Sequence, residues 1–157
     1  MPEQQPVREE NIVRDDEIVY RLISSPEGYN EITGVSPECF RLFRKNESYV
    51  SVERAKYCSL DDALSNGGKI KMWFADGETF WGLASLKVGN IRRHELLDVV
   101  SKYTEKHPGH AGIQMMLSEG LVYKNTIGEP TPMEILALQT YLSGIIEQVV
   151  KCDTSID

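Results

Sequence analysis

The segment Glu17-Ile-Val-Tyr-Arg-Leu-Ile23 is rich in β-branched and aromatic residues, which is the composition of a β-strand. Turn-forming residues follow directly in Ser24-Ser-Pro-Glu-Gly28, and they predict that the strand ends there. A second strand is predicted at Ser48-Tyr-Val-Ser-Val-Glu53, where polar and apolar residues alternate. Together these segments predict a fold that is built on a β-sheet.

The clearest hairpin signal surrounds Asp76-Gly77, a residue pair that favours a type I′ turn between two antiparallel strands. The first arm, residues 69–75, places apolar residues on one face, and the second arm is expected at residues 78–84. A further strand is predicted at residues 110–117, with residues 120–123 as its continuation or as a bent partner. We therefore expect a mixed, mostly antiparallel sheet.

Helices are predicted between these strands from caps, stops and apolar spacing. Short helices are expected at residues 36–43 and 59–66, and a longer one at residues 91–106. Thr131-Pro-Met-Glu134 is a capping box with proline at the first helical position, and apolar residues follow at helical spacing through Val149. The sequence thus predicts an α+β fold, a single domain with a long C-terminal helix.

The length and composition agree with one compact domain. The chain has 157 residues, of which 41% are hydrophobic and 26% are charged, near the values of ordinary globular domains. Residues 1–15 combine prolines, glutamines and dense charge, which predicts a flexible acidic arm. The single domain is then expected at residues 16–151, and a short tail at residues 152–157.

The compartment is predicted from what the sequence lacks. No stretch reaches the roughly 18 consecutive apolar residues of a membrane span, and the first residues lack the basic and apolar order of a secretion signal. The three cysteines, Cys39, Cys58 and Cys152, are odd in number and widely spaced, so a disulfide framework is not expected. These observations predict a cytoplasmic protein with no membrane partner.

The net charge of −7 argues against nucleic acid as a partner, because a polyanion is repelled at long range. One segment, residues 41–56, has the opposite balance, with five basic and two acidic residues beside aromatic ones. A solvated face explains such a segment, and a phosphate-binding face is the alternative. Binding through it would weaken steeply with salt.

Well-known catalytic motifs are absent from the sequence. It contains no Gly-x-x-x-x-Gly-Lys, Gly-x-Gly-x-x-Gly, Gly-x-Ser-x-Gly or His-Glu-x-x-His pattern. The motif signatures of P-loop nucleotidases, Rossmann dehydrogenases and α/β-hydrolases are therefore missing.

His110 is the candidate catalytic residue, since a histidine at the start of a strand can donate or accept a proton near neutral pH. His107 lies beside it across Pro-Gly, but the closing donors of a zinc site are missing, so no metal ligand is assigned.

Three residues are candidates for binding an anionic group: Arg21, Ser51 and Arg54. Arg21 interrupts an apolar strand and carries a planar guanidinium that suits an anion. Ser51 and Arg54 come from the next strand and its end. We expect these three side chains to line one pocket, while a structural role for each is the alternative.

Three segments resemble a small group of functionally uncharacterised bacterial proteins. They are Val19-Tyr-Arg-Leu-Ile23, then Ser36-Pro-Glu-Cys-Phe40 with Val50-Ser-Val-Glu-Arg-Ala55, and finally Gly82-Leu-Ala with His107-Pro-Gly-His-Ala-Gly-Ile113. The resemblance spans roughly residues 19–113 and rests on short motifs. It implies a bacterial protein and names no activity.

Arg21 and Ser51 also resemble two positions of the ADP-ribosyltransferase-like fold, where a strand arginine, a serine on a following strand and a later carboxylate surround a nicotinamide dinucleotide. The chain departs from that pattern, since no Glu-x-Glu or Gln-x-Glu follows the expected hairpin and Glu119 is the carboxylate left for the third position. The resemblance implies a dinucleotide cofactor, with His110 or Glu119 assisting.

The sequence therefore leads to two functional hypotheses. The first is a binding or accessory protein that recognises a protein partner or a small anionic ligand. The alternative is a transferase-like enzyme that uses a nicotinamide dinucleotide. The residues alone assign no cofactor and no oligomeric state.

Overall fold

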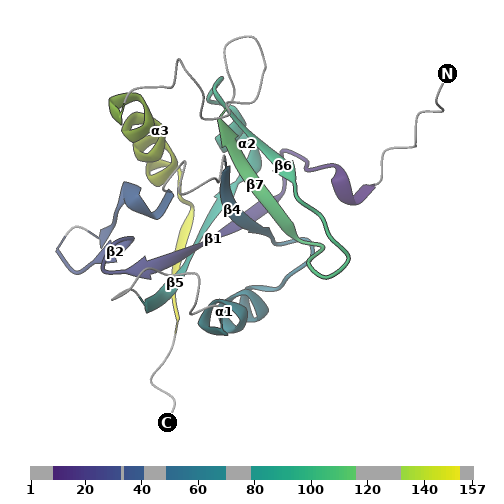
Figure 1. Cartoon of the computed structure of the whole chain (residues 1–157), viewed down its shortest axis with the longest axis horizontal. Helices are drawn as coiled ribbons and strands as arrows, with labels where there is room; N and C mark the ends of the chain where they lie inside the picture. The colour runs from purple at the N-terminus through teal and green to yellow at the C-terminus, as the bar shows by residue number, and fades with distance from the viewer. Residues whose placement is uncertain (1–8, 33, 41–48, 70–78, 116–131, 153–157) are drawn as a thin grey trace.

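The computed structural model describes residues 9–32, 34–40, 49–69, 79–115 and 132–152 (Figure 1). Six strands form one sheet in the order β6-β7-β4-β1-β5-β8, and every neighbouring pair is antiparallel. The strands are β1 (Ile18–Ser25), β4 (Tyr49–Arg54), β5 (Thr79–Lys87), β6 (Leu97–Ser101), β7 (His110–Met115) and β8 (Gln148–Lys151). The α+β class and the antiparallel pairing are confirmed, whereas the parallel pairs of a mixed sheet do not occur among the described strands.

Helices and a small ribbon complete the described part of the chain. Figure 1 shows α1 and α3 on either side of the sheet. The α-helices are α1 (Leu60–Lys69), α2 (Val88–Arg92) and α3 (Pro132–Gly144). The other elements are the 3-10 helices η1 (Glu9–Asn11) and η2 (Pro37–Phe40) and the strands β2 (Tyr29–Asn30) and β3 (Gly34–Val35).

The sheet has two apolar faces because side chains alternate along each strand. On β1, Val19 and Ile23 join the larger cluster, which includes Leu138 and Leu142 of α3. Tyr20 and Leu22, on the same strand, join a smaller cluster with α1. We call these the α3 face and the α1 face.

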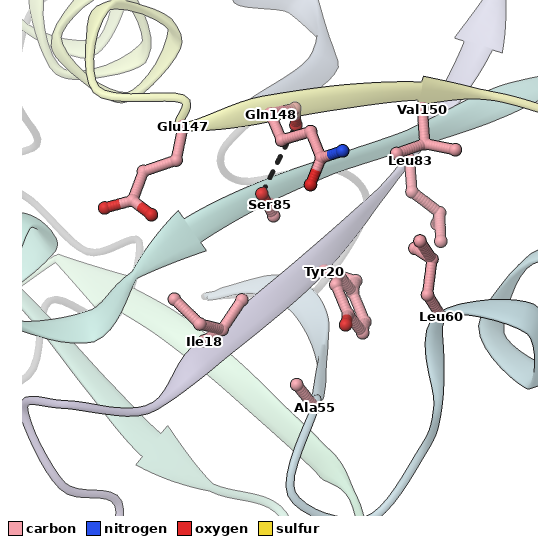
Figure 2. A pocket seen from close by; sticks show the side chains of 9 residues that line it. All are labelled: Ile18, Tyr20, Ala55, Leu60, Leu83, Ser85, Glu147, Gln148 and Val150. Carbon is pink, nitrogen blue, oxygen red and sulfur yellow. Dashed lines mark hydrogen bonds between the residues drawn. The ribbon is translucent and has the colours of Figure 1, made fainter.

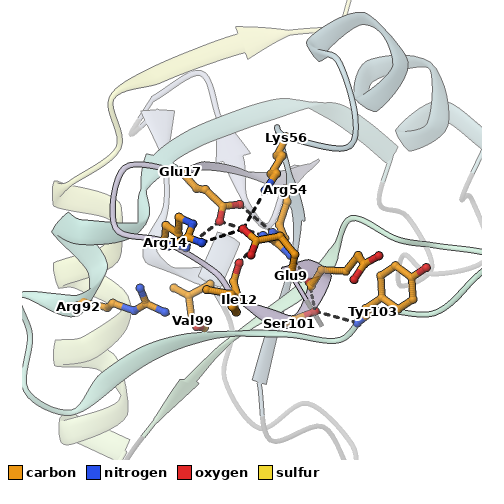
Figure 3. Close-up of polar contacts among 11 residues, drawn as sticks. Glu9, Ile12, Arg14, Glu17, Arg54, Lys56, Arg92, Val99, Ser101 and Tyr103 are labelled. Atoms are coloured by element: carbon orange, nitrogen blue, oxygen red, sulfur yellow. Dashed lines mark hydrogen bonds and ion pairs between the residues drawn. The ribbon is translucent and has the colours of Figure 1, made fainter. Parts of the chain in front are cut away.

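Arg54 anchors the N-terminal segment to the sheet (Figure 3). Its side chain is fully buried, and Nε and Nη2 donate to the Glu17 carboxylate at 2.8 and 2.9 Å. It also donates to the backbone carbonyls of Glu10 and Ile12. Residues 9–15, which composition assigned to the acidic arm, therefore contact the domain, and Val13 is buried in its core.

The long C-terminal helix predicted through Val149 is wrong. Helix α3 ends at Gly144, and the chain continues into β8, which pairs with β5. Two effects explain the change: glycine favours the end of a helix, and Val149 and Val150 are β-branched residues that suit an extended strand. The apolar spacing of this segment fits a helix, but pairing with the edge of β5 makes it an extended strand.

The helix predicted at residues 91–106 is also wrong. Helix α2 ends at Arg92, and residues 97–101 form β6. Leu97 and Val99 are buried and alternate with the partly exposed Asp98 and Val100, as a half-buried strand requires. Arg92 donates to the Asp98 carboxylate and to the Val99 carbonyl, which fixes the turn into β6.

The other predicted elements agree with the structure in part. The strands expected at 17–23, 48–53 and 110–117 correspond to β1, β4 and β7, and the helix expected at 59–66 extends to Lys69 in α1. The segment at 36–43 begins as the 3-10 helix η2, and residues 41–43 lie outside the described residues. Lys69 of the expected first hairpin arm ends α1, and the second arm corresponds to β5. Residues 70–78, with the rest of the first arm and the turn, and residues 116–123 also lie outside the described residues.

We predict that Arg54→Met destabilises the fold by about 3–5 kcal/mol, because it leaves the nearly buried Glu17 carboxylate without its partner. The matched control is Arg14→Met, which removes an exposed, solvent-screened ion pair with Glu9 and should change the stability far less. Urea unfolding of both variants measures the difference, and equal losses would show that Arg54 does not anchor the segment.

The Arg54 contact also predicts an acid dependence of stability. Burial raises the pKa of Glu17, but the hydrogen bonds from Arg54 and from the Arg14 backbone N–H, with the charge of Arg54, outweigh it and lower the pKa. The stabilisation is therefore present above the unfolded-state pKa and is lost as pH falls through the lower folded-state pKa. In Arg54→Met this part of the acid dependence should disappear.

Gly82 allows β8 to lie close against β5. A Cβ atom on Gly82 would lie 2.2 Å from the Val150 carbonyl oxygen, so Gly82→Ala forces the two strands apart. We predict a loss of about 1–3 kcal/mol and faster amide exchange along β8. Gly144→Ala is the control, since its added Cβ meets no atom within 4 Å. Unchanged exchange in Gly82→Ala would contradict this account.

Candidate functional site

The α1 face carries a row of polar side chains that crosses five strands. In the register of the sheet, His110 of β7 lies opposite Glu53 of β4, and Glu53 lies opposite Tyr20 of β1. Tyr20 is also opposite Ser85 of β5, which in turn is opposite Gln148 of β8. Because cross-strand partners point to the same face, these residues form one continuous polar row. A histidine cluster lies at one end and a hollow at the other.

The histidine cluster consists of Ser51, Glu53, His107 and His110. Ser51 Oγ and His110 Nε2 lie 2.9 Å apart, within hydrogen-bonding distance. His107 Nε2 pairs with the Glu53 carboxylate, and the two imidazole rings stack with centroids 5.1 Å apart. The structure thus brings together two sequence candidates, Ser51 and His110, and adds Glu53 and His107.

The environment of His110 favours its neutral form. Burial of the ring, followed by the nearby His107 and Lys102, lowers the pKa of His110 below its ordinary value. A neutral imidazole has one donor and one acceptor nitrogen, so it can accept a proton from Ser51 or share one with a bound ligand. The catalytic role of His110 stays a prediction, and the same geometry suits a ligand contact.

The hollow at the other end has a volume of about 470 Å³ (Figure 2). Apolar side chains form most of its wall, and polar groups from β1, β5 and the start of β8 interrupt them. The lining residues are Ile18, Tyr20, Ala55, Leu60, Leu83, Ser85, Glu147, Gln148 and Val150. Leu60 comes from α1, so the helix and the sheet edge together define the hollow.

Arg21 and Arg54 do not contribute to this face. Arg54 is the buried anchor of the N-terminal segment on the α3 face. In β1, Arg21 shares the phase of Val19 and Ile23, and it donates to the backbone carbonyls of Cys39 and Ser51 at 2.7 and 2.9 Å. Arg21 therefore holds η2 and β4 together, and its side chain lies on the opposite face from the Ser51 hydroxyl.

The predicted pocket of Arg21, Ser51 and Arg54 is therefore not formed. Ser51 and Arg54 are three positions apart on one strand, so their side chains must point to opposite faces. The strand at 48–53 was predicted, and the alternation of side chains along a strand already indicated that Ser51 and Arg54 point to opposite faces. In contrast, Glu147 and Gln148 of the hollow lie in a segment predicted as helix, and only the observed pairing with β5 brings them to the site.

The buried cysteines are not reactive candidates. Burial raises the pKa of the Cys39 thiol to about 11, and burial with the nearby Glu53 and Asp62 raises that of Cys58. Their low exposure confirms that both fill the core as small hydrophobic residues.

The described part of the chain was compared with the requirements of a metal site and of a membrane-spanning helix. There, no group of three or more His, Cys, Asp or Glu side chains is arranged to hold a metal ion. Among the same residues, no helix has the length and apolar character needed to cross a membrane. Comparison of the chain with family models, curated proteins and solved structures gave no match.

We predict that His110 titrates below the ordinary histidine pKa, and that Lys102→Met raises this pKa by removing a nearby positive charge. Imidazole proton shifts, followed by NMR against pH, measure the value directly. Lys106→Met is the control, because Lys106 is not among the groups that shift His110. A His110 pKa at or above the ordinary value would contradict the proposed environment.

Proposed function

We propose that the protein is a binding protein whose ligand occupies the hollow on the α1 face. The observation that carries this proposal is a hollow of about 470 Å³ with an apolar wall and a few polar groups. Its size lies within the range of small-ligand sites, and its mixture of surfaces is typical of them. The apolar wall provides contact area, while Tyr20, Ser85 and Gln148 provide hydrogen bonds that orient the ligand.

The charge at the rim favours a cationic ligand with an apolar body. Glu147 is exposed, and Figure 2 shows its side chain at the Ile18 end of the hollow, at the opposite end from Leu83 and Val150. The net charge of −7 adds a long-range attraction for cations. A small anionic ligand has less support, because Arg21 and Arg54 make their contacts on the opposite face.

The transferase alternative receives little support from the same geometry. Its cofactor would require the Arg21 guanidinium and the Ser51 hydroxyl around one ligand, and these groups lie on opposite faces of the sheet. Half of the basic segment, residues 41–48, lies outside the described residues. Nucleic-acid binding through it stays a prediction.

The three free cysteines suit the cytoplasmic location that we propose.

We predict that benzamidine binds the hollow and that benzoate, its anionic counterpart, binds more weakly. The aromatic ring should contact Ile18 and Tyr20, which line the hollow and are partly exposed, while the amidinium pairs with Glu147. In amide NMR spectra, benzamidine should cause saturable shifts at residues 18–20, 85 and 147–148.

Glu147→Gln should weaken benzamidine binding roughly fivefold, the effect of losing an ion pair worth about 1 kcal/mol. Glu38→Gln is the control, because Glu38 is exposed on η2, away from the hollow. Equal binding of benzoate and benzamidine, or no saturable shift at the hollow, would overturn the proposal.

A further inference from the structure

Strand β8 forms one edge of the described sheet, and the hollow lies directly beside it. It pairs with β5 on one side and is the last strand in the order of the described strands. Gln148, Val149 and Lys151 are exposed, and 41% of Val149 is accessible to solvent. An open strand edge can accept an additional strand, and short exposed edges are used in this way for peptide recognition.

The hydrogen-bonding pattern of β8 shows which of its backbone groups face outward. The Cys152 N–H donates to the Trp81 carbonyl at 2.8 Å, and the register pairs Val150 with Leu83 and Gln148 with Ser85. Narrow and wide pairs alternate along an antiparallel ladder. The N–H and C=O groups of Val149 and Lys151 therefore point away from β5, where an added strand would meet them.

The side chains of β8 connect this edge to the hollow. Gln148 and Val150 line the hollow, so their side chains point to the α1 face. A strand added about 4.8 Å beyond β8 would place alternate side chains on the same face, beside Gln148 and Val150. The side chain beside Gln148 can then extend along the hollow and place its terminus next to Glu147. Figure 2 shows Glu147 and Gln148 at this side of the hollow.

We propose that β8 binds an extended peptide of a partner protein, and that a lysine or arginine side chain of this peptide occupies the hollow. This inference rests on the proposed function and names its ligand class. Lysine and arginine combine an aliphatic stem, which fits the apolar wall, with a terminal cation, which fits Glu147. The Lys151 side chain alternates with Val150 and lies on the other face, so it does not oppose the incoming cation.

The test uses two synthetic peptides with the full chain: acetyl-Thr-Val-Lys-Val-Thr-amide and the same peptide with a central glutamate. We expect the lysine peptide to bind at least roughly fivefold more tightly, since only its side chain complements Glu147. Bound peptide should slow amide hydrogen exchange at Val149 and Lys151, whose N–H groups become hydrogen-bonded. Exchange at Leu83, whose N–H already belongs to the ladder with β8, should change much less.

Backbone variants separate strand addition from simple capture of the side chain. Val149→Pro removes an outward N–H but no hydrogen bond of the ladder with β5, so it should abolish peptide binding and retain benzamidine binding. If this variant fails to fold, a lysine peptide with N-methylated amides on the edge that faces β8 gives the same test. N-methylation on the opposite edge is the matched control and should leave binding unchanged.

Several outcomes would overturn the inference. Equal affinity for the two peptides would show that the cationic side chain does not occupy the hollow. Binding without slower amide exchange at Val149 and Lys151 would show that the peptide does not add to the sheet as a strand. Self-association that protects these two amides, with no competition from the peptide, would assign the edge to a second copy of the chain. Benzamidine binding without peptide binding overturns this inference alone, whereas loss of both overturns the proposed function as well.

Discussion

The buried guanidinium of Arg54 is the constraint on which the rest of the structure depends. A charge without solvent requires partners, and Arg54 finds them in the Glu17 carboxylate and in two backbone carbonyls of the N-terminal segment. This requirement ties residues 9–17 to the end of β4 and fixes which face of β4 is buried. Since side chains alternate along the strand, Ser51 and Glu53 must then point to the other face.

The two faces of the sheet consequently have different roles. On the α3 face, Arg21 and Arg54 satisfy carbonyl and carboxylate groups of neighbouring segments, so their charges stabilise the fold. On the α1 face, the polar row runs from the histidine cluster to the hollow, and α1 covers only part of it. The polar groups of the α1 face are thus the ones available for recognition. The Glu147 carboxylate at the rim of the hollow favours a positively charged ligand.

Local patterns in the sequence predicted the elements better than the site. The alternation in residues 48–53 and the β-branched run at 17–23 identified β4 and β1, and Pro132 identified the start of α3. Apolar spacing predicted helices wrongly in the segments whose structure depends on pairing with distant strands. Val149 and Leu97 fit a helix locally but are extended beside other strands. Glu147 belongs to the site only through the register of β8 on β5. Such pairing between distant segments cannot be predicted from the local pattern of one sequence.

The central claim is that ligand binds on the α1 face, and intermolecular NOEs test it most directly. With methyl-labelled protein and bound benzamidine, the account predicts NOEs from the ring protons to the methyl groups of Ile18, which lines the hollow and is partly exposed. NOEs to Leu138 or Leu142, which pack on the α3 face, would contradict it.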